Sequence, residues 1–281
     1  MQALTEVHYK VRWRTRGGHP GHHASTRQGG GLEFRHHVPL VNAPDPRRFD
    51  VHASLRDPFG QIQVRVFQQK SAIPVFAIAD LSASMRVGGE RAKLTLLAEF
   101  IACLGYSAAR SGDAFGLIGC AEADQPALYV PPSVNAAAAL EAAVRVHHAA
   151  PPGRSAEGLL NAADLVGSRR ALVFLLSDFH LPLALVDRVL SSLAYHDVVP
   201  VILCQRSDYE TLPAWGLARV QDAESGRQRL LVLRPALRQR IRAAYLARRA
   251  ALSALFSRHG RPPLLVQDTF IPDDVTRYFF G

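Results

Sequence analysis

The clearest pattern in the chain is an alternation between unbroken apolar runs and stretches whose apolar residues recur at helical spacing. The run Ile73–Ala79 is almost continuously apolar, as expected of a strand buried on both faces in a parallel sheet. Ala114–Cys120 repeats this pattern. Between the two runs, apolar residues recur every three or four positions and predict a helix that ends at Gly112: Leu94, Leu97, Ala98, Ile101, Leu104 and Ala108.

The same alternation continues to about residue 210. It predicts further strands at Leu128–Val130, Ala171–Ser177 and Val198–Cys204, and further helices over residues 134–148, 156–166 and 183–195. Strands and helices that alternate in this way predict an α/β domain over residues 71–210, with a doubly wound, mostly parallel sheet of Rossmann type.

The two flanks of this domain have different patterns. In residues 1–70, Val7–Trp13 and Gln61–Phe67 alternate like strands, whereas residues 15–32 are rich in Gly, His and Ser and predict an irregular loop. We therefore expect a small β-rich N-terminal element. Residues 211–281 predict a C-terminal extension that completes the fold: a hairpin of Leu217–Gln221 and Arg229–Leu233, an arginine-rich helix from Pro235 to about Arg258, and a strand within Pro262–Gln267.

Candidate ligands for a metal ion follow two of the predicted buried strands. The segment Asp80-Leu81-Ser82-Ala83-Ser84-Met85 follows the first strand, and Asp178 follows a later one. Ligands of open α/β sheets bind at the carboxyl ends of strands. Carboxylate and hydroxyl oxygens completed by water suit Mg²⁺ or Mn²⁺. The alternative is an ordinary Asp/Ser turn or helix cap, which the segment alone favours equally.

Charge is distributed unevenly along the chain, whose formal net charge is +9. Residues 225–267 carry ten arginines and no acidic residue, whereas residues 71–224 carry 11 basic and 16 acidic residues. The basic segment coincides with the predicted helix, whose apolar positions require one buried face, and no nucleic-acid-binding motif accompanies it. We therefore expect packing or an acidic partner for this helix, and not nucleic acid.

The cysteines, apolar runs and histidines lead us to expect a cytoplasmic protein without disulfides and without a cysteine or histidine metal site. Cys103, Cys120 and Cys204 lie in apolar stretches without metal-like or paired spacing, as in a cytoplasmic protein with reduced thiols. We expect no membrane span and no signal peptide, since apolar runs stay far below the roughly 18 residues that a span needs. The histidines of the N-terminal element are expected in an exposed loop and not in a zinc site: His19, His22, His23, His36 and His37.

The Asp80–Met85 segment resembles the metal-ion-dependent adhesion site of von Willebrand factor type A domains. The resemblance implies that one ion is held by an Asp and two Ser of this loop, a hydroxyl of a second loop and an Asp of a third. At the matching positions stand Asp80, Ser82, Ser84, Ser155 and Asp178. Ser155 replaces the usual Thr, which retains the hydroxyl.

The flanks resemble the bacterial family called domain of unknown function 58. The similar segments include Gly31–Phe34, Asp45–Asp50, Gln63–Phe67 and Asp222–Gly226, although Val51 stands where that family usually has Trp. The compact size and Asp57–Gly60 are similar to the MxaS group, accessory proteins of methanol dehydrogenase clusters. The resemblance implies a MoxR-type AAA+ ATPase as partner.

These observations lead to one expected function and two alternatives. We expect a non-enzymatic cytoplasmic interaction module whose Mg²⁺ or Mn²⁺ site accepts a carboxylate from a client protein, in maturation of a client such as methanol dehydrogenase. No Walker A, GxGxxG or GxSxG motif is present. The first alternative is a metal-dependent phosphoesterase or nuclease that uses Asp80 and Asp178, and the weaker one is nucleic-acid binding by the arginine-rich helix.

Overall fold

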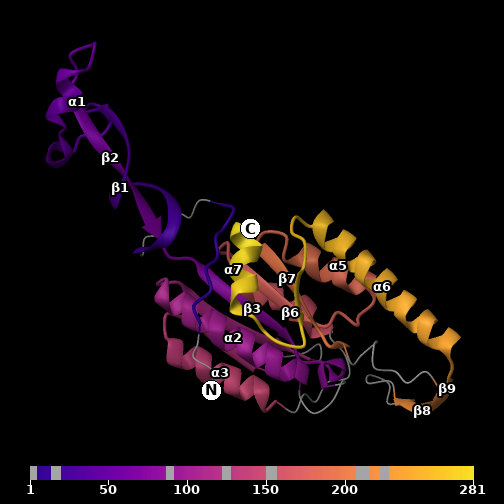
Figure 1. Ribbon diagram of the computed structural model, residues 1–281. Helices are drawn as coiled ribbons and strands as arrows, with labels where there is room; N and C mark the ends of the chain where they lie inside the picture. The colour runs from indigo at the N-terminus through magenta and orange to yellow at the C-terminus, as the bar shows by residue number, and fades with distance from the viewer. Residues whose placement is uncertain are drawn as a thin grey trace. The chain divides into compact units, whose positions relative to one another are not determined.

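The computed structural model describes residues 5–13, 20–86, 92–121, 128–149, 157–206, 215–221 and 228–281. The larger of its two compact units is built around a six-stranded sheet (Figure 1). Its strands follow the order β10-β7-β6-β3-β4-β5, and only the β4–β5 pair is antiparallel among those described. The bounds are β3 (Pro74–Asp80), β4 (Ala114–Cys120), β5 (Leu128–Ser133), β6 (Leu172–Ser177), β7 (Asp197–Cys204) and β10 (Leu264–Gln267). The predicted α/β class with a mostly parallel sheet is confirmed.

Helices cover both faces of this sheet. The seven α-helices of the described residues are α1 (Val51–Leu55), α2 (Ala92–Arg110), α3 (Ala136–His147), α4 (Ala162–Val166), α5 (Leu183–Ser192), α6 (Pro235–Arg258) and α7 (Pro272–Phe280). One face carries α2, where Phe100 packs against Phe174 of β6. Figure 1 shows α3 beside α2. Gly105 allows this approach, since a Cβ there would lie 2.3 Å from the Cβ of Ala139.

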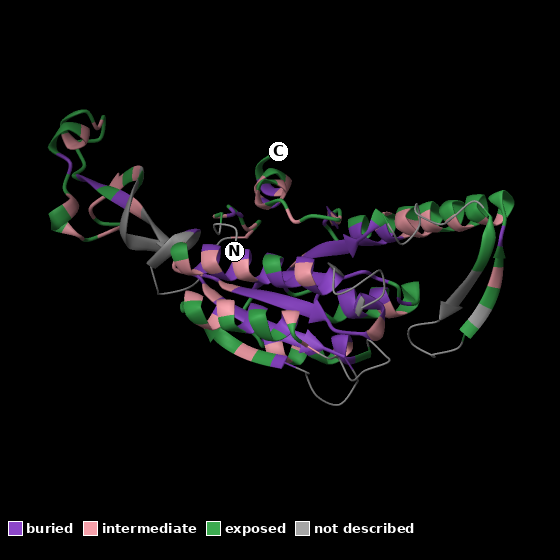
Figure 2. Ribbon diagram, turned by 60° about the horizontal axis from the view of Figure 1, so that its bottom comes forward, coloured by how far each residue is buried: buried purple, intermediate pink, exposed green. Residues whose placement is uncertain are grey.

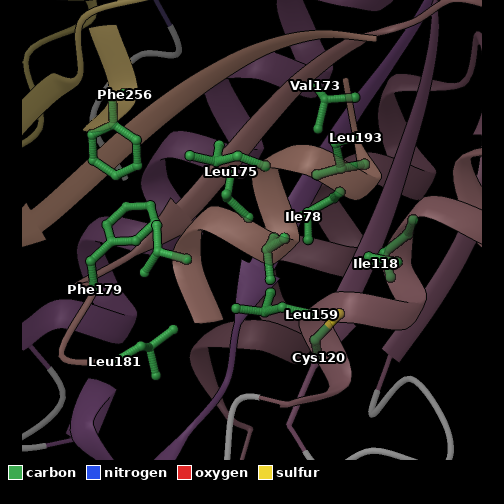
Figure 3. Close-up of a cluster of buried hydrophobic side chains, with 14 of the residues drawn as sticks. Ile78, Ile118, Cys120, Leu159, Val173, Leu175, Phe179, Leu181, Leu193 and Phe256 are labelled. Carbon is green, nitrogen blue, oxygen red and sulfur yellow. The ribbon is translucent and has the colours of Figure 1, made fainter. Parts of the chain in front are cut away.

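The opposite face holds a continuous apolar cluster built by β3, β4, β6, the segment around α4, α5 and the end of α6 (Figure 3). Alternate residues of each strand supply it, as Ile78, Val173 and Leu175 illustrate. Phe179 and Phe256 contact each other edge to face, with ring centroids 4.9 Å apart. Because each strand is buried on both faces, its sequence is uniformly apolar, and this explains why these strands could be predicted.

Both edge strands of the sheet are short or interrupted. At one edge, β5 contains the consecutive prolines Pro131 and Pro132, which have no N–H to donate. At the other edge, β10 has four residues.

Residues Val11–Ile73 form a compact unit of their own, separate from the unit of Pro74–Gly281 that also includes the chain up to Lys10. In the smaller unit, β1 (Pro20–Pro39) pairs antiparallel with β2 (Gln63–Ser71). The expectation of an irregular loop at residues 15–32 was therefore wrong from Pro20 onward, because β2 provides a backbone ladder that the Gly-rich segment follows with several register shifts.

Asp50 organises the turn between these strands. Its carboxylate caps α1 by accepting from Ala53 N at 3.0 Å, and its Oδ2 accepts from Arg65 Nε at 2.6 Å and contacts His37 Nε2 at 3.0 Å. The hydrogen bond from Ala53 N, followed by those from Arg65 and His37, holds the pKa of Asp50 far below its ordinary value. The expectation of exposed loop histidines is wrong for His22, His23, His36 and His37, which belong to β1, and His23 is buried there; His19 lies outside the described residues.

The segment Val7–Trp13, expected as a strand, belongs to no strand. Val7 and Tyr9 are buried and anchored individually: Val7 N donates to Ser107 Oγ of α2, and the Tyr9 hydroxyl donates to Asp113 Oδ2 at 2.7 Å. The alternation in this segment therefore reflects two buried side chains and not a ladder of backbone hydrogen bonds.

The C-terminal extension agrees closely with its prediction. The hairpin consists of β8 (Gly216–Gln221) and β9 (Gln228–Leu233), and α6 spans Pro235–Arg258. However, α6 buries less than its pattern predicted. Its buried residues are Leu252, Leu255 and Phe256 near its C-terminal end, and Ala244 is exposed (Figure 2). No helix among the described residues is long and apolar enough to cross a bilayer.

A buried ion pair joins β7 to the segment that leads into β10. Arg261 donates to both oxygens of Asp197, at 2.6 and 2.7 Å, and the two side chains are 6% and 8% exposed. We expect Arg261→Ala to lower the free energy of unfolding by about 3–5 kcal/mol, because the substitution removes the guanidinium that neutralises the buried Asp197 carboxylate.

Urea unfolding monitored by circular dichroism would measure this loss. Arg277→Ala, which breaks the exposed pair with Asp274, is the matched control and should cost no more than about 1 kcal/mol. Equal losses for the two variants would show that the Arg261 pair does not stabilise the fold.

Candidate functional site

The candidate site lies where the order of strands reverses direction. The chain proceeds from β3 to β4 and β5 on one side, then returns to β6 on the other side of β3 and continues to β7. The carboxyl ends of β3 and β6 are therefore neighbours at a topological switch point, with Ala79 in register with Leu176. Ligands of open α/β sheets bind in the crevice beside such a point. Asp80 ends β3, and Asp178 follows β6.

Asp80 is completely buried, and both of its oxygens are hydrogen bonded. Oδ1 accepts from Ser82 N at 2.8 Å, and Oδ2 accepts from Ser177 Oγ at 2.6 Å. Burial, reinforced by the nearby Asp178 carboxylate, raises the pKa of Asp80 to about 6, against the lowering effect of the two serines. The strand end thus holds a carboxylate whose charge is costly.

A chain of oxygens connects the first loop to Asp178. Ser82 Oγ lies 3.1 Å from Ser84 Oγ, and Ser84 Oγ donates to Asp178 Oδ1 at 3.1 Å. Ligands about 2.1 Å from an octahedral Mg²⁺ are separated by roughly 2.9 Å along each edge of the octahedron. The hydroxyl and carboxylate spacing is therefore close to that of a Mg²⁺ shell, and the donor set fits the ion.

The structure brings together four of the five residues expected to bind a metal: Asp80, Ser82, Ser84 and Asp178. Ser155, the fifth, lies outside the described residues. Among the described residues, no group of three or more His, Cys, Asp and Glu side chains could hold a metal ion. A site at this edge would thus combine two carboxylates with hydroxyls and water.

Lys93 is a member of the site that the sequence did not reveal. It stands at the start of α2, and its Nζ donates to Asp178 Oδ2 at 2.9 Å. Only three lysines occur in this arginine-rich chain, and Lys93 follows the Asp80–Met85 loop closely. The rarity of lysine in this chain was the one feature that could have pointed to Lys93 as a site residue. Helical spacing alone does not show that its side chain turns into the crevice.

The turn after Asp178 is held in an unusual conformation. Phe179 has φ of +52°, a left-handed conformation that costs free energy in a bulky residue. Three groups stabilise it: Phe179 N donates to Ser177 Oγ at 2.8 Å, the Phe179 ring packs against Phe256, and Arg248 of α6 donates to the carbonyl oxygens of Phe179 and Leu181. Arg248 is therefore not part of a solvated face, because it positions the loop that carries Asp178.

A pocket of about 280 Å³ opens beside this turn. Asp178 and His180 line it from the sheet, and Tyr245, Arg248 and Arg249 line it from α6. The carboxylate end of the site therefore borders a space with a cationic and partly apolar wall, in which a side chain of another molecule has room.

The comparisons with known proteins identify a family and leave the activity open. A family model described as "Protein of unknown function DUF58" matches residues 44–251. No curated protein matches.

Two solved structures are similar to this chain at low sequence identity. The first is an aerotolerance-related membrane protein from Bacteroides fragilis, 15% identical over 74% of this chain and 97% of that one, with a TM-score of 0.44. The second is the conserved hypothetical protein BatB from Bacteroides thetaiotaomicron, 12% identical over 75% of this chain and 100% of that one, with a TM-score of 0.42.

The raised pKa of Asp80 predicts how stability varies with pH in chelator-treated protein. The folded pKa, about 6, exceeds the ordinary value of 3.8, so the folded state binds more protons between these values. Through this residue, stability falls as pH rises from about 4 to 7. We expect Asp80→Asn to remove the dependence and to stabilise the protein at pH 7.5 by roughly 1–3 kcal/mol.

Urea unfolding of both proteins at pH 5 and pH 7.5, with EDTA present, would check this expectation. Glu141→Gln, on the exposed side of α3, is the control that should behave like the wild type. An Asp80→Asn protein with the same pH dependence as the wild type would contradict the prediction.

Proposed function

The chain belongs to the family of proteins of unknown function DUF58, and we propose that it acts as a non-enzymatic interaction module whose partner binds through a divalent cation. One observation carries the proposal: the contiguous oxygens of Ser82, Ser84 and Asp178, at 3.1 Å spacing, lie beside Asp80 at the switch point of the sheet. This arrangement supports a site of the von Willebrand factor type A kind.

The proposed ligands are of two kinds, neutral hydroxyls and negatively charged carboxylates. The hydroxyls of Ser82 and Ser84 supply neutral oxygen ligands, Asp80 and Asp178 supply the negative charge, and Ser155 is the proposed fifth contributor. A bound Mg²⁺ or Mn²⁺ would supply positive charge and an open coordination position. Ser177 and Ser82 N hold the Asp80 carboxylate in one orientation.

A carboxylate is the group that the partner would contribute. Serine hydroxyls leave the ion with more positive charge than an all-carboxylate shell would, so an incoming anion is attracted. The pocket beside Asp178, with Arg248 and Arg249 in its wall, attracts the same sign of charge. Binding of an acidic side chain at this edge requires no bond to be made or broken in the partner.

We further propose a MoxR-type AAA+ ATPase as the partner and maturation of a client protein, such as methanol dehydrogenase, as the process. The resemblance of the flanking segments to the DUF58 family, and of the compact size and Asp57–Gly60 to the MxaS group, supports this assignment. An ATP-dependent partner places the interaction in the cytoplasm.

A pull-down with the MoxR-type ATPase encoded in the same genome tests the proposal. We expect the ATPase to be retained in millimolar Mg²⁺ and lost in EDTA. The Asp80→Ala variant should lose at least about tenfold of the retained ATPase even with Mg²⁺, because it lacks a charged ligand. Glu141→Gln is the control for a charge removed elsewhere.

Equal recovery of the ATPase in Mg²⁺, in EDTA and with Asp80→Ala would contradict the cation-dependent mechanism. Hydrolysis of generic phosphoesters in Mn²⁺, lost in Asp80→Ala, would instead support the metal-dependent phosphoesterase.

A further inference from the structure

The chain itself supplies a cation to the candidate site. Lys93 Nζ donates to Asp178 Oδ2 at 2.9 Å, and the side chains of Lys93 and Asp178 are 2% and 1% exposed. An ammonium group withdrawn from water is retained only where a buried anion offsets its lost hydration. Both oxygens of Asp178 are therefore already engaged. Oδ2 accepts from the Lys93 ammonium, and Oδ1 accepts from Ser84 Oγ and His180 N.

The position of Lys93 at the start of α2 is electrostatically unfavourable for a cation. The helix begins at Ala92, so Lys93 lies in its first turn, and no acidic residue accompanies it there. The first turn of a helix carries partial positive charge and disfavours a cation. The ion pair with Asp178, 85 positions away in sequence, therefore helps to offset both the desolvation of the ammonium and this unfavourable end of the helix.

The net charge of the site disfavours the binding of a second cation. Asp80, Asp178 and Lys93 together carry one net negative charge when both carboxylates are ionised. A divalent cation would leave the crevice with one net positive charge until an anion arrived. Cations a few ångströms apart repel each other strongly in a crevice that excludes water, since neither solvent nor salt screens them there.

We propose that Lys93 is a resident counter-ion that competes with the divalent cation for Asp178 and keeps the affinity of the site for that cation low. The inference rests on the proposed function and deepens it, because the carboxylate of the partner would restore neutrality. Without the ammonium, the site has two carboxylates for one divalent cation, and its net charge is zero as soon as the cation binds.

Isothermal titration of the full chain with Mg²⁺ alone, and with Mn²⁺ alone, tests the inference. Lys93→Met preserves the length of the side chain and removes its charge, and we expect it to bind either ion about 10- to 100-fold more tightly than the wild type. Lys10→Met is the matched control at an exposed lysine and should not change the affinity. The Lys93→Met/Asp80→Ala double variant should lose the gain, because it lacks a second carboxylate.

The outcomes separate the two proposals. A wild type that binds Mg²⁺ as tightly as Lys93→Met overturns the role of Lys93 and leaves the proposed cation site in place. No binding by either protein overturns both the cation site and the competition. Tighter binding by Lys93→Met that survives in the double variant overturns the assignment of the cation to this site.

A second measurement covers the case in which Lys93→Met is too unstable to titrate. Thermal unfolding followed by circular dichroism, with and without Mg²⁺, is then applied to Lys93→Met and to the polar variant Lys93→Gln. Stabilisation by Mg²⁺ that exceeds the wild-type shift in either variant supports the competition. Variants that remain unfolded at all Mg²⁺ concentrations overturn it, since the ammonium would then be irreplaceable.

Discussion

Two carboxylates buried at the adjacent ends of β3 and β6 determine how the carboxyl edge of the sheet is built. Burial makes the charge of Asp80 costly, and the nearby Asp178 carboxylate repels it; both effects, burial first, raise the pKa of Asp80. Serine hydroxyls, backbone N–H groups and one ammonium group surround the pair and offset the cost. The hydrogen-bond donors at this edge are therefore arranged around the two carboxylates.

The same pair explains the placement of elements far from it in sequence. Asp178 needs a tight turn after β6, and Phe179 adopts a left-handed conformation there. The turn is stabilised from α6, through Arg248 on its backbone and Phe256 on its ring. The end of α6 that packs on the sheet is thus also the end that supports the site. The remainder of the helix extends with its side chains largely exposed (Figure 2).

Much of the α/β unit could be predicted from the sequence, for a physical reason. Strands buried on both faces must be apolar throughout, so β3, β4, β6 and β7 were visible as runs, and Pro235 and Gly260 bracket α6. The Asp80–Met85 loop was visible as a candidate site because strand ends converge at one edge. Ser155 lies outside the described residues.

What could not be predicted depends on contacts between distant residues. Strand β1 is Gly-rich and forms a strand because β2 is there to pair with it. Arg248 looked like one more solvated arginine of α6 until the structure placed it on two carbonyl groups. Lys93 belongs to the site only because α2 returns past β6, and helical spacing contains no information about that. Helix α7 has a short amphipathic pattern and was not anticipated at all.

The prolines of β5 limit how this protein can assemble with others. A sheet grows by adding a strand to an edge whose N–H and C=O groups are free to pair. Pro131 and Pro132 remove donors from one edge of the central sheet, and β10 offers only four residues at the other. Strand addition is therefore disfavoured on both sides, which protects the sheet against edge-to-edge aggregation. Partners of the α/β unit are accordingly expected to bind through side chains and loops, and not by extending its sheet.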